Sequence, residues 1–207
     1  MSIKILNIGF GNAPAVADWI LDCGIVPSII SDNDFSLDDL VIIPGVGSVE
    51  FVHRRLKELN LDKSLIAHMR KAGKVIGICA GMQVMGRYLE EADGQGLGEI
   101  HADVIGNAKG RNTGWTDIIL ERDGLPDFWQ RGFGRKQKLE GRIYSNHNFS
   151  YSQDEVSNAA QYSYVKDEIV QVIATEHFLG MQFHPEKSQV LGHQLAKLVV
   201  DSYAYRG

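Results

Sequence analysis

Residues 77–83, Gly-Ile-Cys-Ala-Gly-Met-Gln, constrain the fold of this chain more than any other segment. They follow the apolar run 74–76, which predicts a short buried strand, and they precede residues 84–89, which predict a helix. A cysteine between two glycines at such a junction is the cysteine form of the nucleophile elbow. The flanking glycines fit because so sharp a turn leaves little room for a β-carbon. The turn places the Cys79 sulfur outside the sheet and at a helix N-terminus, where the dipole favours the reactive thiolate.

The alternative interpretation of Cys79 is a buried core cysteine, because a free cysteine packs as a small hydrophobic residue. Residues 180–188, Gly-Met-Gln-Phe-His-Pro-Glu-Lys-Ser, favour the catalytic interpretation. Pro185 disfavours the helical region for the residue before it, so we expect His184 to be extended. Side chains two apart in extended chain point to the same side, which brings Glu186 beside His184. Together with Cys79 they supply a nucleophile, a base and a carboxylate that orients the base.

Composition bounds the class of protein. The chain has 207 residues, 44% of them hydrophobic, which suits one globular domain with a sizeable core. A net charge of −5 argues against nucleic-acid binding, and we expect the basic cluster at 131–142 to be a solvated loop. The only two cysteines, Cys23 and Cys79, make no disulfide framework.

No Cys/His cluster has the spacing of zinc ligands, so we expect no metal. We also expect no cofactor. No apolar run approaches 18 residues, and the N-terminus lacks the pattern of a signal peptide. We therefore expect a cytoplasmic protein without a membrane span.

The first half alternates between apolar runs and helical periodicity. Strands are expected at 3–8, 26–31, 40–43 and 74–76. Helices are expected from Asn12 as N-cap to Gly24, at 49–59 and at 61–72. This alternation predicts an α/β fold in which helices cover both faces of a mostly parallel central sheet. Ligands bind such sheets at the carboxyl ends of the strands, where the Cys79 elbow falls.

The second half contains short β-like runs before a final helix, at 115–120, 141–145, 159–165, 169–175 and 178–183. These runs predict a smaller antiparallel β portion in the C-terminal half. We expect residues 123–135 to form a long loop.

The chain resembles the class I glutamine amidotransferases over essentially its whole length, as a single type 1 domain of residues 1–207 with a flavodoxin-like fold. The motifs that carry the resemblance are the Cys79 elbow with Met82-Gln83, Pro44-Gly45-Val46-Gly47-Ser48, Gly114-Trp115, and Gln182-Phe183-His184-Pro185-Glu186-Lys187-Ser188. Within the class, Pro-Gly-Val-Gly and the final Lys-Ser make it most similar to HisH, the glutaminase subunit of imidazole glycerol phosphate synthase. The GMP, anthranilate and carbamoyl phosphate branches are less similar.

The resemblance implies that L-glutamine is hydrolysed to glutamate and ammonia through a thioester on Cys79. In that scheme His184 is the acid and base, and Glu186 orients it. The residues implied in oxyanion stabilisation and glutamine binding are Gly45, Val46, Gly47, Ala80, Gln83, Asn148 and Phe149. The Ala80 amide is also expected from the elbow itself, since it follows the nucleophile.

The resemblance further implies a partner, a synthase subunit that receives the ammonia. In the HisH branch this partner is a (β/α)8 barrel cyclase, HisF-like, which docks over the glutaminase site. Asn12, Trp115 and Lys187 match positions of that interface, although Trp115 suits a core aromatic equally well.

Several segments depart from the histidine-pathway pattern: Asn7, Ala13-Pro14-Ala15-Val16, Asn112-Thr113-Gly114-Trp115-Thr116 and Asn146-His147-Asn148-Phe149. These departures spare the triad and leave the partner open. A close alternative is a HisH-like subunit that supplies ammonia to a sugar amidotransferase in surface-polysaccharide (LPS/O-antigen) biosynthesis. A non-catalytic interaction module and a cysteine hydrolase or peptidase are further alternatives.

Overall fold

The computed structural model describes residues 2–9 and 12–204. Its main sheet contains seven strands: β1 (Ile3–Leu6), β2 (Ser28–Ile30), β3 (Leu40–Ile43), β4 (Lys74–Ile78), β11 (Tyr162–Lys166), β12 (Ile169–Ala174) and β13 (Phe178–Met181). Their order is β11-β12-β13-β4-β3-β1-β2. The five strands from β13 to β2 run parallel, and β12 and β11 are antiparallel at one edge.

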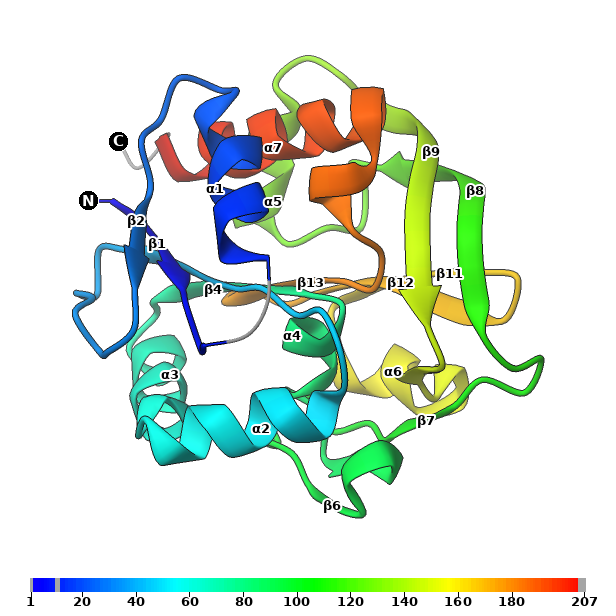
Figure 1. The fold of residues 1–207 in the computed structure, drawn as a ribbon. Coiled ribbons are helices and arrows are strands. Elements are labelled where there is room, and N and C mark those ends of the chain that lie inside the picture. Colours follow the sequence, from blue (N-terminus) through cyan, green and yellow to red (C-terminus); the bar gives the residue numbers. More distant parts are fainter. Residues whose placement is uncertain (1, 10–11, 205–207) are drawn as a thin grey trace.

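Helices cover both faces of this sheet (Figure 1). α1 (Ala13–Leu21) and α7 (Gln189–Ala204) lie on one face, and α2 (Val49–Glu58) and α3 (Leu61–Arg70) lie on the other. β3 is buried along its whole length, as a central parallel strand must be. Ile42 faces the core under α1 and α7, whereas Val41 and Ile43 face the core over α2 and α3. The alternation of strand side chains therefore produces two hydrophobic layers.

Two smaller sheets accompany the main sheet. β8 (Asn112–Glu121) and β9 (Lys138–His147) pair antiparallel over ten residue pairs. The other sheet has the order β10-β7-β5-β6, formed from β5 (Tyr88–Leu89), β6 (Gly94–Gln95), β7 (Val104–Gly106) and β10 (Phe149–Tyr151). Only Asn148 separates β9 from β10, so the chain bends there from one small sheet into the other.

Short helices complete the described chain: α4 (Ala80–Gln83), α5 (Asp127–Gln130), α6 (Gln153–Ala159), and 3₁₀ turns at Glu90–Ala92, Arg131–Phe133 and Pro185–Lys187. No helix within residues 2–9 and 12–204 is long and apolar enough to cross a membrane. The expected mostly parallel sheet, with helices on both faces and a smaller antiparallel portion, is confirmed.

Two local expectations were wrong, and one helix was not expected. The helix expected over 84–89 is absent, because α4 ends at Gln83 and residues 88–89 form β5. Gly86 instead bridges Ile100, and a β-carbon there would lie 2.9 Å from Val104 Cγ2. Residues 123–135 are not a plain loop, since α5 lies within them and buries Trp129 completely. The unexpected helix is α6 at residues 153–159, and the strand expected over 159–165 begins at Tyr162.

Candidate active site

Cys79 occupies the sharp turn between β4 and α4. Its backbone has φ 51° and ψ −112°, a region that non-glycine residues rarely adopt and that costs about 1–3 kcal/mol. The turn is held from both sides: the Cys79 amide donates to the Met181 carbonyl at 2.8 Å, and the Cys79 carbonyl accepts from the Gln83 amide at 3.0 Å. The sequence therefore predicted the elbow correctly, and the strained backbone is concentrated at the cysteine.

Two glycines allow the segments around the elbow to touch. A β-carbon on Gly81 would lie 2.1 Å from the Ile43 carbonyl oxygen, and one on Gly45 would lie 2.2 Å from the Gly81 nitrogen. No side chain fits at either position. The loop that follows β3 is therefore packed directly against the first turn of α4. This contact fixes the 45–47 segment beside Cys79.

His184 is buried next to the cysteine and has the expected extended conformation, with φ −98° and ψ 94°. Its amide donates to the Tyr144 carbonyl at 2.9 Å. The Ser188 hydroxyl donates to the His184 carbonyl at 2.6 Å and accepts from the Tyr144 amide at 3.1 Å. These contacts anchor the His-Pro-Glu segment to β9.

The side chain of His184 lies between the other two members of the expected triad. Its Nδ1 is 2.8 Å from Glu186 Oε1, and it hydrogen-bonds with the Cys79 sulfur. Burial lowers the pKa of His184, but the hydrogen bonds to Cys79 and Glu186 outweigh it and raise the pKa to about 9. The imidazole is thus protonated at neutral pH. An imidazolium in this position pairs with the thiolate form of cysteine, which is the nucleophilic form.

Asn12 contacts the triad at Glu186. It stands at the N-cap of α1, as expected, but its side chain makes no capping hydrogen bond. Asn12 Nδ2 instead donates to Glu186 Oε1, the same oxygen that faces His184. The Glu186 side chain is completely buried. The contact of Asn12 with a partner stays a prediction.

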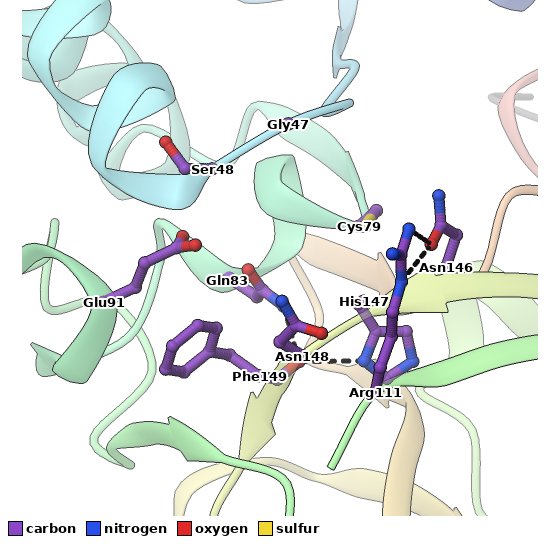
Figure 2. Close-up of a pocket in the computed structure, with 10 residues that line it drawn as sticks. All are labelled: Gly47, Ser48, Cys79, Gln83, Glu91, Arg111, Asn146, His147, Asn148 and Phe149. Carbon is purple, nitrogen blue, oxygen red and sulfur yellow. Dashed lines mark hydrogen bonds between the residues drawn. The ribbon is translucent and has the colours of Figure 1, made fainter.

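A pocket of about 310 Å³ opens in front of Cys79 (Figure 2). Its described lining residues are Gly47, Ser48, Cys79, Gln83, Glu91, Arg111, Asn146, His147, Asn148 and Phe149. The pocket thus gathers five of the predicted site residues from three separate segments. Gly45, Val46, Ala80, His184 and Glu186 do not line it.

His147 forms part of the pocket wall and is neutral. Its Nδ1 lies 2.9 Å from the Phe149 carbonyl oxygen, and its Nε2 lies 3.0 Å from Asn112 Nδ2. Burial and the positive charge of nearby His184 lower the pKa of His147 to about 4, despite the bond to Phe149. The imidazole then donates from Nδ1 and accepts at Nε2. It braces the bend between β9 and β10.

Two glutamines connect this wall to the nucleophile. Gln83 Nε2 donates to the Phe149 carbonyl at 2.7 Å and to Gln182 Oε1 at 3.2 Å. Gln182 Nε2 lies 3.7 Å from the Cys79 sulfur. Gln182 is fully buried, so its amide can only serve the inside of the site.

Glu91 and Arg111 are charged pocket residues that the sequence reasoning missed. Glu91 follows β5 in a 3₁₀ turn, and its Oε2 accepts from the Val49 amide at the start of α2 at 2.6 Å. Arg111 precedes β8 and hydrogen-bonds to Asn146 Oδ1. Neither residue belongs to a local motif, so only the pocket that they line together with Cys79 identifies them.

An aromatic and basic cluster lies on the surface beside the triad. Trp115 is 40% exposed, so its alternative position in the core is wrong. Its ring meets the Tyr144 ring edge-on at 5.6 Å, and the Arg142 guanidinium lies 5.4 Å from the Trp115 ring centre. Lys187 Nζ lies 5.9 Å from the Tyr144 ring centre. We call these four residues the surface cluster.

In the part of the chain that the structure describes, no three His, Cys, Asp or Glu side chains form a metal-binding group. Cys23 and Cys79 are both free thiols.

Comparison with known proteins gives this arrangement a family. The model of the class I glutamine amidotransferases matches residues 21–200. HisH of imidazole glycerol phosphate synthase from Staphylococcus aureus is 29% identical over 201 residues, covering 96% of each chain. HisH 2 of Nitrobacter winogradskyi is also 29% identical, covering 93% of this chain and 94% of that protein.

Solved structures agree at the level of the fold. A crystal structure of a glutamine amidotransferase superposes with a TM-score of 0.66 at 15% identity, covering 99% of this chain and all of the other. The structure of PurLQS from Thermotoga maritima gives a TM-score of 0.65 at 17% identity, covering 98% and 97%. Because the family model spans most of its length, this chain belongs to the class I glutamine amidotransferases.

Proposed function

We propose that this chain is the glutaminase subunit of a two-subunit amidotransferase and hydrolyses L-glutamine to L-glutamate and ammonia. The observation that carries the proposal is the buried Cys79–His184–Glu186 arrangement beside a pocket with one acidic and one basic side chain. A thiolate and imidazolium pair is suited to acyl transfer from a carboxamide.

In the first half of the reaction, the Cys79 thiolate attacks the side-chain carboxamide carbon of glutamine. The developing oxyanion is stabilised by the Ala80 amide and by an amide of the 45–47 loop, each typically contributing about 2.7–4 kcal/mol. His184 then gives its proton to the departing nitrogen, the carbon–nitrogen bond breaks, and ammonia leaves a glutamyl thioester. In the second half, His184 takes a proton from water, which attacks the thioester and releases glutamate.

Glu91 supports free glutamine as the substrate. Its carboxylate is held by the Val49 amide at the start of α2 and faces the pocket, so it suits the α-ammonium group of an amino acid. In the view of Figure 2, Gln83 lies between Glu91 and Cys79, and Asn148 and Phe149 lie below them. These three residues contribute the rest of the predicted binding surface.

The partner that we propose is the cyclase of imidazole glycerol phosphate synthase, by analogy with the HisH relatives. The surface cluster supports a docking face here, because exposed aromatic and arginine side chains are enriched at protein interfaces. It adjoins Glu186 through Lys187, next in sequence. A partner seated there receives ammonia close to where it forms.

The experiment that tests the glutaminase compares Cys79→Ala with Cys23→Ala, which removes the half-buried second thiol. We expect Cys79→Ala to lower glutamate release by at least about 10³-fold and to abolish labelling by a glutamine-analogue electrophile. Cys23→Ala is expected to retain both. Full activity in Cys79→Ala would contradict the proposal, and a wild-type chain that is never labelled would indicate a non-catalytic module.

The partner is tested separately, by measuring glutamate release with and without a co-expressed cyclase and its nucleotide ligand. Stimulation by the ligand supports the cyclase partner. Failure of the two chains to associate would contradict it and would direct the same assay to a sugar amidotransferase.

A further inference from the structure

Arg111 is a positioned cation without a carboxylate partner among residues 2–9 and 12–204. Its Nε and Nη2 donate to Asn146 Oδ1 at 3.1 and 2.7 Å, and Thr113 Oγ1 donates to the same oxygen at 3.3 Å. An amide oxygen fixes the guanidinium but does not neutralise it. Nη1 and one N–H of Nη2 are left for another acceptor. A guanidinium fixed at a pocket wall in this way suits an anion.

The backbone around Arg111 is also fixed. Arg111 lies at the end of the segment 107–111 between β7 and β8. The Asn107 amide donates to the Asn148 carbonyl at 2.8 Å, which ties the start of the segment to the pocket wall. Its end continues into β8, where Asn112 pairs with His147. The guanidinium is therefore built on a braced loop.

The pocket presents this cation opposite an anion. Figure 2 shows Glu91 and Arg111 on opposite sides, with Gln83, Asn148 and Phe149 between them and Cys79 above. A free amino acid carries an ammonium group and a carboxylate on one carbon atom, so it can meet both side chains at once. An uncharged amide or a glutamine within a peptide offers neither charge.

We infer that Arg111 binds the α-carboxylate of glutamine and thereby restricts this site to the free amino acid. The inference rests on the proposed glutaminase function and adds a specificity residue to it. Arginine suits the role because its planar donors match the two oxygens of a carboxylate. A lysine at this position retains the charge without that geometry.

The test uses two substrates. L-Glutamine carries the α-carboxylate, and 4-aminobutanamide keeps the amine and the carboxamide but lacks the carboxylate. For Arg111→Met we expect KM for L-glutamine to rise by about 10- to 100-fold with kcat within about threefold, and kcat/KM for 4-aminobutanamide to stay unchanged. For Arg111→Lys we expect a KM for L-glutamine between those of the wild-type chain and Arg111→Met. The control is Lys109→Met, because Lys109 is an exposed cation in the same loop that pairs with Glu168 at 2.8 Å outside the pocket.

An equal loss on both substrates would overturn the inference, since it indicates a structural role for Arg111. An unchanged KM for L-glutamine would overturn it too. Binding of L-glutamine to the Cys79→Ala chain, measured by calorimetry, separates this outcome from failure of the glutaminase proposal. We expect Arg111→Met to weaken that binding by at least about tenfold even where no hydrolysis occurs, and equal binding would contradict the inference.

Discussion

Two histidines of this site are almost equally buried, but at neutral pH one is protonated and the other is neutral. His184 is 3% exposed and has its pKa raised to about 9, whereas His147 is 7% exposed and has its pKa lowered to about 4. Burial lowers the pKa of both. The hydrogen-bond partners therefore decide the outcome: a carboxylate and a thiol for His184, and a carbonyl and an amide for His147.

The difference shows that the two histidines have separate roles, one in proton transfer and one in structure. His184 holds a proton that it can transfer, which general acid–base catalysis needs. His147 holds the β9–β10 bend in one tautomer and has no mobile proton near neutral pH. The positive charge of His184 also helps to keep His147 neutral. His184 thus serves the chemistry of the site, and His147 serves its shape.

Replacing Glu186 by glutamine removes the carboxylate that holds the protonated His184. An amide holds the imidazolium less strongly than a carboxylate, so the pKa of His184 falls and its orientation loosens. We expect kcat to drop by about 10³- to 10⁴-fold, and the alkaline limb of its pH profile to move below the wild-type position near pH 9. Measuring kcat from pH 6 to 10 tests both effects.

The control for this variant is Glu99→Gln, which removes a carboxylate that pairs with Arg70 at 3.8 Å. It is expected to leave the pH profile unchanged. An alkaline limb that stays in place in Glu186→Gln would contradict the role of the carboxylate in holding the proton.

The pH dependence of stability sharpens the comparison. His147 has a folded pKa of about 4 against an ordinary 6.5, so between these values the unfolded chain binds the proton and the folded chain does not. Stability falls as the pH falls through this window, by up to about 3 kcal/mol. His184 has the opposite sign: its contribution is complete below pH 6.5 and is lost as the pH rises through about 9.

Urea unfolding at pH 7.5 and pH 5 measures the acid side of this dependence. The wild-type chain is expected to lose more stability between the two pH values than His147→Gln, which cannot titrate there. Equal losses would show that His147 is not held neutral by the fold. The effect amounts to about 2 kcal/mol at pH 5, since the window is only partly crossed.

The arrangement of Cys79, His184 and Glu186 was predictable from sequence because short local motifs specify it. The glycines around Cys79 specify the elbow, and Pro185 between His184 and Glu186 sets the spacing of the base and its carboxylate. The same reasoning gave the parallel sheet, since β3 is apolar throughout and β4 is apolar after Lys74.

The two charged residues of the pocket were not predictable in the same way. Arg111 and Glu91 reach the pocket from segments that carry no motif, through the turn after β5 and the loop before β8. The expected helix over 84–89 failed for a related reason. Its periodicity suits a helix, but the contacts of Gly86 with Ile100 and Val104 favour the small sheet. Tertiary packing decided these positions.

Asn12 contacts Glu186 and was also expected at the partner interface, and its replacement gives the smallest expected effect. Removing its hydrogen bond to Glu186 with Asn12→Ala is expected to slow labelling of Cys79 by a glutamine-analogue electrophile by at most about tenfold. Asn12→Asp is expected to slow it further, because a second carboxylate would face Glu186. Asn158→Ala, an exposed asparagine on α6, is the control.

Labelling needs no turnover, so the measurement can be made on the isolated chain and again with a synthase subunit. A loss in the isolated chain means that Asn12 acts through Glu186, as the contact indicates. A loss that arises only with the synthase present would contradict that role and would assign Asn12 to the interface, where the sequence resemblance puts it. The same comparison therefore tests whether the triad and the docking face are joined at this residue or are independent.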